Sequence, residues 1–494
     1  MGMLGHPRTT SKLKIDHAYG SRKEIQSSGA VHFPRTRWQT QAKLMTGGLG
    51  GTARFPQPFS LGRRSMKFLN TADGGFAKAF EALLAQARET TARVDGVVSE
   101  ILARVRAEGD AALCDYTARF DRVALTPAQL GVGADEIEAA VGGVKPELLA
   151  ALDLAATRIE AFHRAQMPVD MQMHDDVGVT MGMRWSPLDA VGIYVPGGKA
   201  AYPSSVLMNA VPARVVGVAR IAMVVPAPDG VLNPLVLAAA RRAGVTEIFR
   251  VGGAQAVAAL AFGTQSIAAV DRIVGPGNAY VAEAKRQVFG RVGIDGVAGP
   301  SEVVVLADAA NDATIVAIDL LAQAEHDEAA QSILITDDEG FGRAVAEAVL
   351  AALGSLPRAA IAGASWEAHG AVVVVRDWAE AAALTNRLAP EHVQIMIADP
   401  APLFGAIRHA GAIFVGRYTP EALGDYIAGP NHVLPTGRTA RFASGLSVFD
   451  FLKRTTWIEA GQAALDALGP AAVALAEAEG LTAHARSLAM RLGQ

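Results

Sequence analysis

An acid and an imidazole stand side by side in the stretch Leu388-Ala389-Pro390-Glu391-His392. A histidine exchanges protons near neutral pH without any tuning, and a glutamate does so when its surroundings are dry. Neighbouring side chains point in different directions, so the pair is suited to two separate proton-handling tasks. Taken alone, the dipeptide favours a simpler interpretation, a surface glutamate beside a half-buried histidine, since catalytic groups are the minority.

Other side chains that could bind a metal or a substrate occur at scattered places along the chain. Gln323 and His326 are three residues apart at the end of an apolar helical segment, so both could reach one metal ion, although glutamine is an unusual zinc ligand. Asp425 and His432 fall in a Gly/Pro-rich stretch that reads as a loop, where functional residues are enriched. Near the C-terminus, Glu479 and His484 flank Gly480-Leu481.

Two glycine-rich turns follow short apolar runs and precede helical segments. They are Val251-Gly252-Gly253 and Gly275-Pro276-Gly277-Asn278. A nucleotide pyrophosphate would meet helix N-termini at such places. Neither turn has the dinucleotide-binding spacing of glycines, so tight strand-to-helix connections explain them equally well.

The elements that would position these residues alternate in type from about residue 190. Short apolar runs of strand length are separated by helical segments, first from Gly192 to 288 and again from Val303 to Val415. This pattern predicts an α/β fold with two Rossmann-like, doubly wound parallel-sheet domains and helical arms at both ends. The predicted divisions are a disordered basic extension (1–65), an N-terminal helical region (66–180), a first Rossmann-like domain (181–300), a second one (301–437) and a C-terminal helical arm (438–494).

Residues 1–65 differ in composition from the rest of the chain. They hold eleven Lys or Arg residues and two acids, and they lack helical or alternating periodicity. Such a segment is expected to be disordered. A start codon assigned too far upstream, with Met66 as the true start, or an inert tail is favoured over an organellar transit peptide, because no amphipathic helix is evident.

Composition excludes several classes of protein. No apolar run approaches the length of a membrane span, and the formal net charge of −4 does not favour nucleic-acid binding. The single cysteine, Cys114, cannot form a disulfide within the chain. A reducing compartment is therefore expected, the cytoplasm, or an organelle if residues 1–65 are a transit peptide.

Taken together, the motifs resemble those of the histidinol dehydrogenase family. The resemblance runs from about residue 68 to the C-terminus, and many modest strings in the right order make it specific. The strings are Tyr194-Val195-Pro196-Gly197-Gly198, Gly252-Gly253-Ala254-Gln255, Gly275-Pro276-Gly277-Asn278, Gly299-Pro300-Ser301-Glu302, Gln323-Ala324-Glu325-His326-Asp327, Ala389-Pro390-Glu391-His392, Gly429-Pro430-Asn431-His432-Val433-Leu434-Pro435-Thr436, and Glu479-Gly480-Leu481 with His484. Glu328 departs from the proline expected after the His-Asp pair.

The resemblance implies a homodimer that oxidises L-histidinol to L-histidine with two NAD+ and one zinc ion per subunit, completing histidine biosynthesis. By similarity, the zinc ligands would be Gln323, His326, Asp425 and His484. The zinc ligands, together with Ser301, His392 and Glu479, would contact substrate, and Tyr194, Gln255 and Asn278 would contact NAD. Glu479 and His484 would act across the dimer, so that the two active sites are shared.

The chemistry of a four-electron oxidation suits the adjacent pair. Alcohol oxidation needs a base for the hydroxyl proton, and aldehyde oxidation without a reactive cysteine needs a base that activates water. We therefore expect His392 to serve the first step and Glu391 the second. Rival functions are the oxidation of other diols on the same fold, hydrolysis by metal-bound water, and a non-catalytic binding protein.

Overall fold

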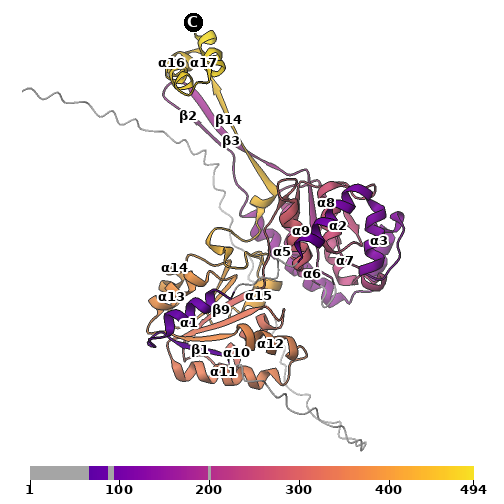
Figure 1. Ribbon diagram of the computed structural model, residues 1–494, viewed down its shortest axis with the longest axis vertical. Coiled ribbons are helices and arrows are strands. Elements are labelled where there is room, and N and C mark those ends of the chain that lie inside the picture. The colour runs from indigo at the N-terminus through magenta and orange to yellow at the C-terminus, as the bar shows by residue number, and fades with distance from the viewer. Residues whose placement is uncertain (1–65, 87–93, 198–201, 494) are drawn as a thin grey trace, which may run out of the picture. The chain divides into compact units, whose positions relative to one another are not determined.

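The computed structural model describes residues 66–86, 94–197 and 202–493 (Figure 1). The extension predicted over residues 1–65 lies outside the described residues. The described chain divides into two compact units, one that holds both parallel sheets and one formed by residues 171–183 and 456–493, here called the arm. In the described part of the chain, every helix is too short or too polar to cross a bilayer.

The first parallel sheet has five strands in the order β6-β5-β4-β7-β8. Its strands are β4 (Ala190–Tyr194), β5 (Arg220–Val224), β6 (Glu247–Phe249), β7 (Arg272–Val274) and β8 (Gly293–Ile294). The connecting helices are α6 (Pro203–Val215), α7 (Pro234–Ala243), α8 (Gly253–Phe262) and α9 (Ala279–Val288). The strand order reverses between β4 and β7, and ligands bind at such a switch point in open α/β sheets.

Helices cover both faces of this sheet because successive strand residues point to opposite sides. Ile193 packs into a core with α5 (Pro146–Arg164), α6 and α7, against which α4 (Ala134–Gly142) also packs. Tyr194 packs on the other side with α2 (Asp95–Glu108), α3 (Asp110–Phe120), α8 and α9. Burial on both faces accounts for the unbroken apolar runs in the sequence.

The second sheet has six strands in the order β1-β11-β10-β9-β12-β13. They are β1 (Lys67–Asn70), β9 (Glu302–Ala307), β10 (Gln331–Thr336), β11 (Ala371–Val374), β12 (His392–Met396) and β13 (Ala412–Val415). Without β1, this order repeats that of the first sheet, and every strand pairing in both sheets is parallel. The duplicated, doubly wound architecture predicted from the sequence is confirmed.

Two sets of helices enclose the second sheet (Figure 1). On one face lie α10 (Ala313–Ala324), α11 (Glu339–Leu353) and α12 (Ala359–His369). On the other lie α1 (Phe76–Leu84), α13 (Trp378–Leu388) and α14 (Ala401–Ala406). The short helix α15 (Glu421–Tyr426) follows β13. Single 3-10 turns occur at Pro127–Gln129, Pro228–Gly230, Thr439–Arg441, Val448–Phe451 and Met490–Leu492.

Two regions predicted to be wholly helical contain strands. In the first, β1 pairs with β11, which lies about three hundred residues further along, so local periodicity could not reveal it. The arm contains the hairpin of β2 (Met171–His174) and β3 (Val179–Pro187), and β14 (Leu452–Ala460) completes a three-stranded sheet. A Cβ on Gly182 would lie 2.2 Å from the Trp457 ring, so this glycine lets the large side chain cover the hairpin.

The arm ends in α16 (Gln462–Ala478) and α17 (Thr482–Ala489). The C-terminal arm was predicted to begin at residue 438, whereas the compact unit takes up the chain from Thr456. Residues 438–455 belong to the unit with the two parallel sheets, where Phe451 is buried in the core beside α6.

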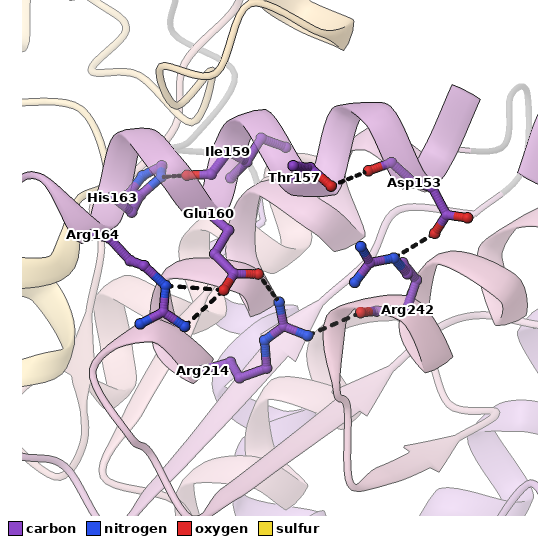
Figure 2. A network of polar contacts seen from close by, with 8 residues as sticks. All are labelled: Asp153, Thr157, Ile159, Glu160, His163, Arg164, Arg214 and Arg242. Atoms are coloured by element: carbon purple, nitrogen blue, oxygen red, sulfur yellow. Dashed lines mark hydrogen bonds and ion pairs between the residues drawn. The ribbon is translucent and has the colours of Figure 1, made fainter. Parts of the chain in front are cut away.

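Ion pairs and hydrogen bonds connect α5 to α6 and α7 (Figure 2). The Glu160 carboxylate accepts hydrogen bonds from Arg164 and Arg214, and the Arg214 guanidinium also donates to the carbonyl oxygen of Arg242. Arg242 in turn pairs with Asp153 on α5. The network joins α5, α6 and α7. Because Glu160 and Arg214 each contact two partners, these contacts form a network, which stabilises more than isolated surface ion pairs do.

Candidate active site

The Glu391-His392 pair lies where α13 ends and β12 begins. Ala389 closes the helix in the left-handed conformation with φ 44°, and Pro390 prevents the helix from continuing. An alanine at positive φ is strained, and the surrounding contacts must hold it there. Side-chain alternation along β12 then turns His392 towards α10 and Glu391 towards the opposite face.

The imidazole of His392 is held by one of its two nitrogens. Nδ1 lies 3.1 Å from the carbonyl oxygen of Glu302 and 3.1 Å from Oε1 of Gln323. Both partners are acceptors, so Nδ1 carries the proton and Nε2 bears the lone pair. Nε2 is buried and has no hydrogen-bond partner among the residues that the structure describes.

Burial lowers the pKa of His392 to about 3. His326 and His432 contribute to this lowering of the pKa to a smaller extent than burial does, because a second positive charge would be unfavourable near them. The ring also packs against Phe414, with the two ring centroids 6.0 Å apart. At neutral pH the imidazole is therefore uncharged, as a general base must be before it takes a proton.

The carboxyl group of Glu391 lies close to the imidazole of His392, although the two side chains start towards opposite faces of the sheet. Oε2 of Glu391 lies 3.7 Å from Nδ1 of His392 and accepts a hydrogen bond of 3.0 Å from the backbone N–H of Glu302. The exposed fraction of Glu391 is 6% and that of His392 is 4%, which excludes the interpretation of a surface glutamate.

A group of three possible metal ligands lies beside this pair. One ligand atom from each of His326, Glu421 and Asp425 lies within 4.8 Å of the others. Asp425 was predicted to lie on a loop, and this is wrong, since it occupies the last turn of α15. The helix is only six residues long and follows Pro420, so its sequence shows no helical period.

The pKa values of these side chains are shifted mainly because the side chains are buried. Burial raises the pKa of Asp425 to about 6 and that of Glu421 well above its ordinary value. It also lowers the pKa of His432 to about 4. The His326 ring is exposed, yet enough of the chain surrounds it for desolvation to lower its pKa. A divalent cation would favour the charged carboxylates and the neutral imidazoles.

Three further residues belong to this cluster: Glu421 and Glu302, for which the sequence predicted no role, and His432, which it indicated as a candidate beside Asp425. Glu421 is 4% exposed, with Oε1 3.5 Å from Nδ1 of His392, and its Oε2 is buried without a hydrogen-bond partner among the described residues. His432 Nδ1 lies 3.8 Å from Asp425 Oδ1, and Glu302 contacts both members of the pair. Glu421 precedes Asp425 by four residues, one helical turn, but this spacing becomes informative only once α15 is known to be a helix.

The remaining predicted substrate and metal residues are divided between the two units. Gln323 is buried in the last turn of α10, and Ser301 directly precedes β9. Glu479 and His484 are exposed and lie in the arm, at the end of α16 and on α17. The structure thus places Gln323 in contact with His392 and groups His326 with Asp425. The contribution of the arm stays a prediction.

The three predicted NAD contacts follow strands of the first sheet. Tyr194 ends β4, and its hydroxyl oxygen accepts a hydrogen bond of 3.1 Å from the backbone N–H of Gly253. Gln255, in the first turn of α8, is 2% exposed and has an unpaired Oε1 among the described residues. Asn278 caps α9 by accepting from two backbone N–H groups. These positions surround the carboxyl ends of β4, β6 and β7, the edge where open α/β sheets bind ligands.

Close packing of the turns explains the glycines in this region. A Cβ on Gly275, which has φ 108°, would lie 2.2 Å from the backbone oxygen of Tyr194. Cβ atoms on Gly197 and Gly252 would lie 2.5 and 2.4 Å from the ring of Pro226. Only glycine lets the four connections come together at this edge.

The chain segment that follows α15 is tied to α5. The Arg158 guanidinium donates to the carbonyl oxygens of Ile427 and Ala428 at 2.7 and 3.1 Å. Asn431 donates to the carbonyl oxygen of Met208 at 2.6 Å and lies 3.4 Å from Nε2 of His163. Helices packed on the first sheet thereby fix the segment that carries His432.

A family model described as histidinol dehydrogenase matches residues 84–492 of the chain. The chain belongs to the histidinol dehydrogenase family. A histidinol dehydrogenase from Gluconobacter oxydans is 65% identical over 427 residues, which cover 86% of this chain and 99% of the relative. One from Ruegeria pomeroyi is 60% identical over 426 residues, covering 86% and 98%.

A solved structure of a histidinol dehydrogenase shows the same fold. The crystal structure of histidinol dehydrogenase from Elizabethkingia anophelis aligns with a TM-score of 0.82 at 35% sequence identity, covering 87% of this chain and 98% of that one. The family resemblance stated from the motifs is therefore confirmed. The assignment of individual residues to zinc, substrate and NAD stays a prediction.

Proposed function

We propose that the protein is a histidinol dehydrogenase that oxidises L-histidinol to L-histidine by way of L-histidinal, with two NAD+ consumed per turnover. This would be the last step of histidine biosynthesis. The observation that carries the proposal is the buried Nε2 of His392, which has no hydrogen-bond partner among the described residues and lies next to Glu391 and to a group of side chains that could hold a metal ion. The names of relatives that are 60 to 65% identical support the choice of substrate.

In the first oxidation, His392 acts as the base. Its Nδ1 proton is directed at two acceptor oxygens, so the ring cannot turn without losing both hydrogen bonds. Nε2 then receives the proton of the substrate hydroxyl while hydride leaves the same carbon. The neutral state of the ring before the reaction follows from its burial.

In the second oxidation, Glu391 activates water. Oxidising an aldehyde to an acid requires an oxygen atom from water. Water either hydrolyses a thioester that has formed on a cysteine, or adds to the aldehyde carbon before the second hydride leaves. Cys114 is unsuited to the first route, since burial raises the pKa of its thiol and it packs against the core of the first sheet. Glu391 therefore takes a proton from the water that adds to the aldehyde carbon, and a second hydride then leaves.

The donor set beside the pair suits a zinc ion. Nitrogen from His326 and carboxylate oxygen from Asp425 are ligand atoms that zinc accepts, and Glu421 adds a further buried carboxyl group. The amide oxygen of Gln323 lies beside His392. We assign Gln323, His326 and Asp425 to the metal, with the partner subunit's His484 as the fourth ligand. When bound, zinc would orient the amine and imidazole of the substrate and stabilise negative charge on its oxygen.

The first sheet would bind NAD through Tyr194, Gln255 and Asn278. NAD+ would accept the hydride in each of the two steps. Substrate would be held by the metal ligands, Ser301 and His392, together with Glu479. Since Glu479 and His484 belong to the arm, we infer a homodimer in which each arm completes the site of the other subunit.

Formation of NADH from L-histidinol tests the proposed function. Purified protein with NAD+ and L-histidinol is expected to release two NADH for each L-histidine formed. A chelator should abolish the activity and added zinc should restore it. If no NADH forms with zinc present, the dehydrogenase assignment is wrong, and ester or amide hydrolysis by the same metal group becomes the next activity to assay.

A further inference from the structure

Glu302 lies opposite Glu391 at the amino ends of two neighbouring parallel strands. The register of β9 and β12 places His392 beside Val303, so the residues that precede each of them are also adjacent. Glu302 is 3% exposed and Glu391 is 6% exposed. Nothing in the chemistry of the two oxidations requires a second glutamate at this place.

The two glutamates exchange hydrogen bonds. The backbone N–H of Glu302 donates to Oε2 of Glu391 at 3.0 Å, and the backbone N–H of Glu391 donates to Oε2 of Glu302 at 3.2 Å. Each carboxyl group therefore holds the backbone of the residue that carries the other. Without these bonds, the backbone N–H groups of Glu302 and Glu391 would lose these partners in a buried place, which costs free energy.

Glu302 also contacts the second member of the pair through its main chain. Its carbonyl oxygen lies 3.1 Å from Nδ1 of His392 and, with Gln323, sets the tautomer of the ring. The position of this oxygen relative to the ring depends on how tightly the start of β12 is held against β9. The Glu302 side chain supplies one of the bonds that hold it.

We propose that Glu302 is a positioning residue for the Glu391-His392 pair, whose carboxyl oxygen fixes the backbone of Glu391 and so orients both side chains for proton transfer. The inference rests on the proposed function for its kinetic consequence. Its structural consequence, a single fixed tautomer of His392, does not depend on which reaction the protein catalyses. Misplacing a reacting group by about 1 Å costs on the order of 100-fold in rate.

Three substitutions separate geometry from charge. Glu302→Gln keeps the length of the side chain and an oxygen that can accept from the Glu391 N–H, but it carries no charge. Glu302→Asp keeps the charge and withdraws the acceptor by one methylene. Glu302→Ala removes both. Ser365→Ala is the matched control, since the Ser365 hydroxyl is also fully buried and also bonds a backbone group, the carbonyl oxygen of Ala330, away from the pair.

Kinetics should follow geometry. Glu302→Asp and Glu302→Ala are expected to lower kcat by about 100-fold with both L-histidinol and L-histidinal, with KM for NAD+ unchanged because the nucleotide residues lie on the other sheet. Glu302→Gln and Ser365→Ala should retain most of the wild-type kcat. If Glu302→Asp is active and Glu302→Gln is not, charge acts in place of geometry and the proposal is overturned.

The tautomer of His392 gives a readout without substrate. Histidine-selective 15N labelling, with the signal assigned by its absence in His392→Asn, should show a neutral ring protonated at Nδ1 in the wild type and in Glu302→Gln. In Glu302→Asp, and in Glu302→Ala if it folds, the two tautomers should exchange. The same fixed tautomer in every variant would overturn the proposal. A wild type that shows the tautomer but forms no NADH would reject only the proposed function.

Discussion

His392 illustrates how a single side chain acquires its role from its surroundings. Its Nδ1 is engaged by Glu302 and Gln323, and its Nε2 is left without a partner among the described residues. An ordinary buried histidine bonds through both nitrogens or reaches water. A lone pair kept unpaired in a dry site costs free energy, and that cost is accounted for if a substrate hydroxyl supplies the missing hydrogen bond.

Substituting the pair should separate the two oxidations. Glu391→Gln is expected to retain the rate of alcohol oxidation in a single turnover. Its rate of aldehyde oxidation should fall by about 100- to 10,000-fold, the range for the loss of a general base. His392→Asn should lose the alcohol step by a similar factor. Stopped-flow measurement of NADH from L-histidinol and from L-histidinal distinguishes the steps. Normal oxidation of L-histidinal by Glu391→Gln would show that this division of labour is wrong.

At the scale of secondary-structure elements, the two sheets use opposite edges. The predicted NAD residues lie at the carboxyl edge of the first sheet, whereas Glu391 and Glu302 lie at the amino edge of the second. At the switch point of the second sheet, the Asp308 carboxylate binds Arg417 and the backbone N–H of Ala398. At this switch point, the carboxylate and the backbone N–H are therefore already engaged in contacts within the second sheet's own connections.

The turn after β7 is held by a buried ion pair. Lys285 donates to the carbonyl oxygen of Gly275 at 3.0 Å, and Asp295, its ion-pair partner, accepts from the N–H of Gly275 at 2.8 Å. Only 3% of the Lys285 side chain and 9% of the Asp295 side chain are exposed. Both polar groups of the glycine at the switch point are therefore fixed by side chains from outside the turn.

Breaking this ion pair should weaken NAD binding. Lys285→Met leaves a buried carboxylate without its partner, so we expect a loss of roughly 3–5 kcal/mol of stability and a higher Kd for NADH. Lys285→Met/Asp295→Leu should recover much of the stability, since an apolar pair replaces a buried ion pair at little cost, but not the affinity. Denaturant unfolding and NADH fluorescence titration measure the two effects. Full recovery of affinity in the double variant would contradict a role for the pair in fixing the turn.

At the scale of the whole molecule, the proposed contribution of His484 to the partner subunit's site can be tested with mixed dimers. If the partner subunit's His484 completes the site, His392→Asn and His484→Asn homodimers should both be inactive. Unfolding and refolding them together should restore activity, because one site of each mixed dimer then contains only wild-type residues. With random pairing, about a quarter of the wild-type activity is expected. No recovery in verified mixed dimers would show that each subunit uses its own arm.

Buried His163 links the stability of the molecule to pH. Burial lowers the pKa of this imidazole, which bonds the carbonyl oxygen of Ile159 and is fully buried. Because the unfolded chain takes up a proton at the ordinary pKa and the folded chain does so only at a lower pH, stability falls as the pH drops below about 6.5, by at most about 1.4 kcal/mol per pH unit for one proton.

Urea unfolding between pH 7.5 and 5 tests this contribution. His163→Gln should be less stable than the wild type at neutral pH and should lose less stability on acidification. His409→Gln makes the same substitution at a partly buried position between α14 and β13 and serves as the control. An unchanged slope in His163→Gln would assign the acid sensitivity to other groups.

The amino-acid sequence by itself determined the alternation of strands and helices from residue 190 to 415, the duplicated α/β class and the family. Both parallel sheets are buried on their two faces, so their strands leave continuous apolar runs that can be read locally. The motifs are also local, because a tight turn between a strand and a helix requires glycine or proline at positions only a few residues apart. Elements with exposed faces or distant partners, such as β1, β2 and β14, carried no comparable pattern.

Only the tertiary structure decided which of these residues meet. Glu302 and Glu391 are 89 residues apart, and their reciprocal hydrogen bonds depend on the register of two strands that are separated along the chain by four helices and two other strands. The same holds for Glu421, whose carboxyl group reaches His392 across the amino edge of the second sheet. Residue types and local spacing predict which groups could act, but long-range strand register sets their distances. The roles proposed here, His392 Nε2 as the base and Glu302 as the residue that positions it, rest on those distances.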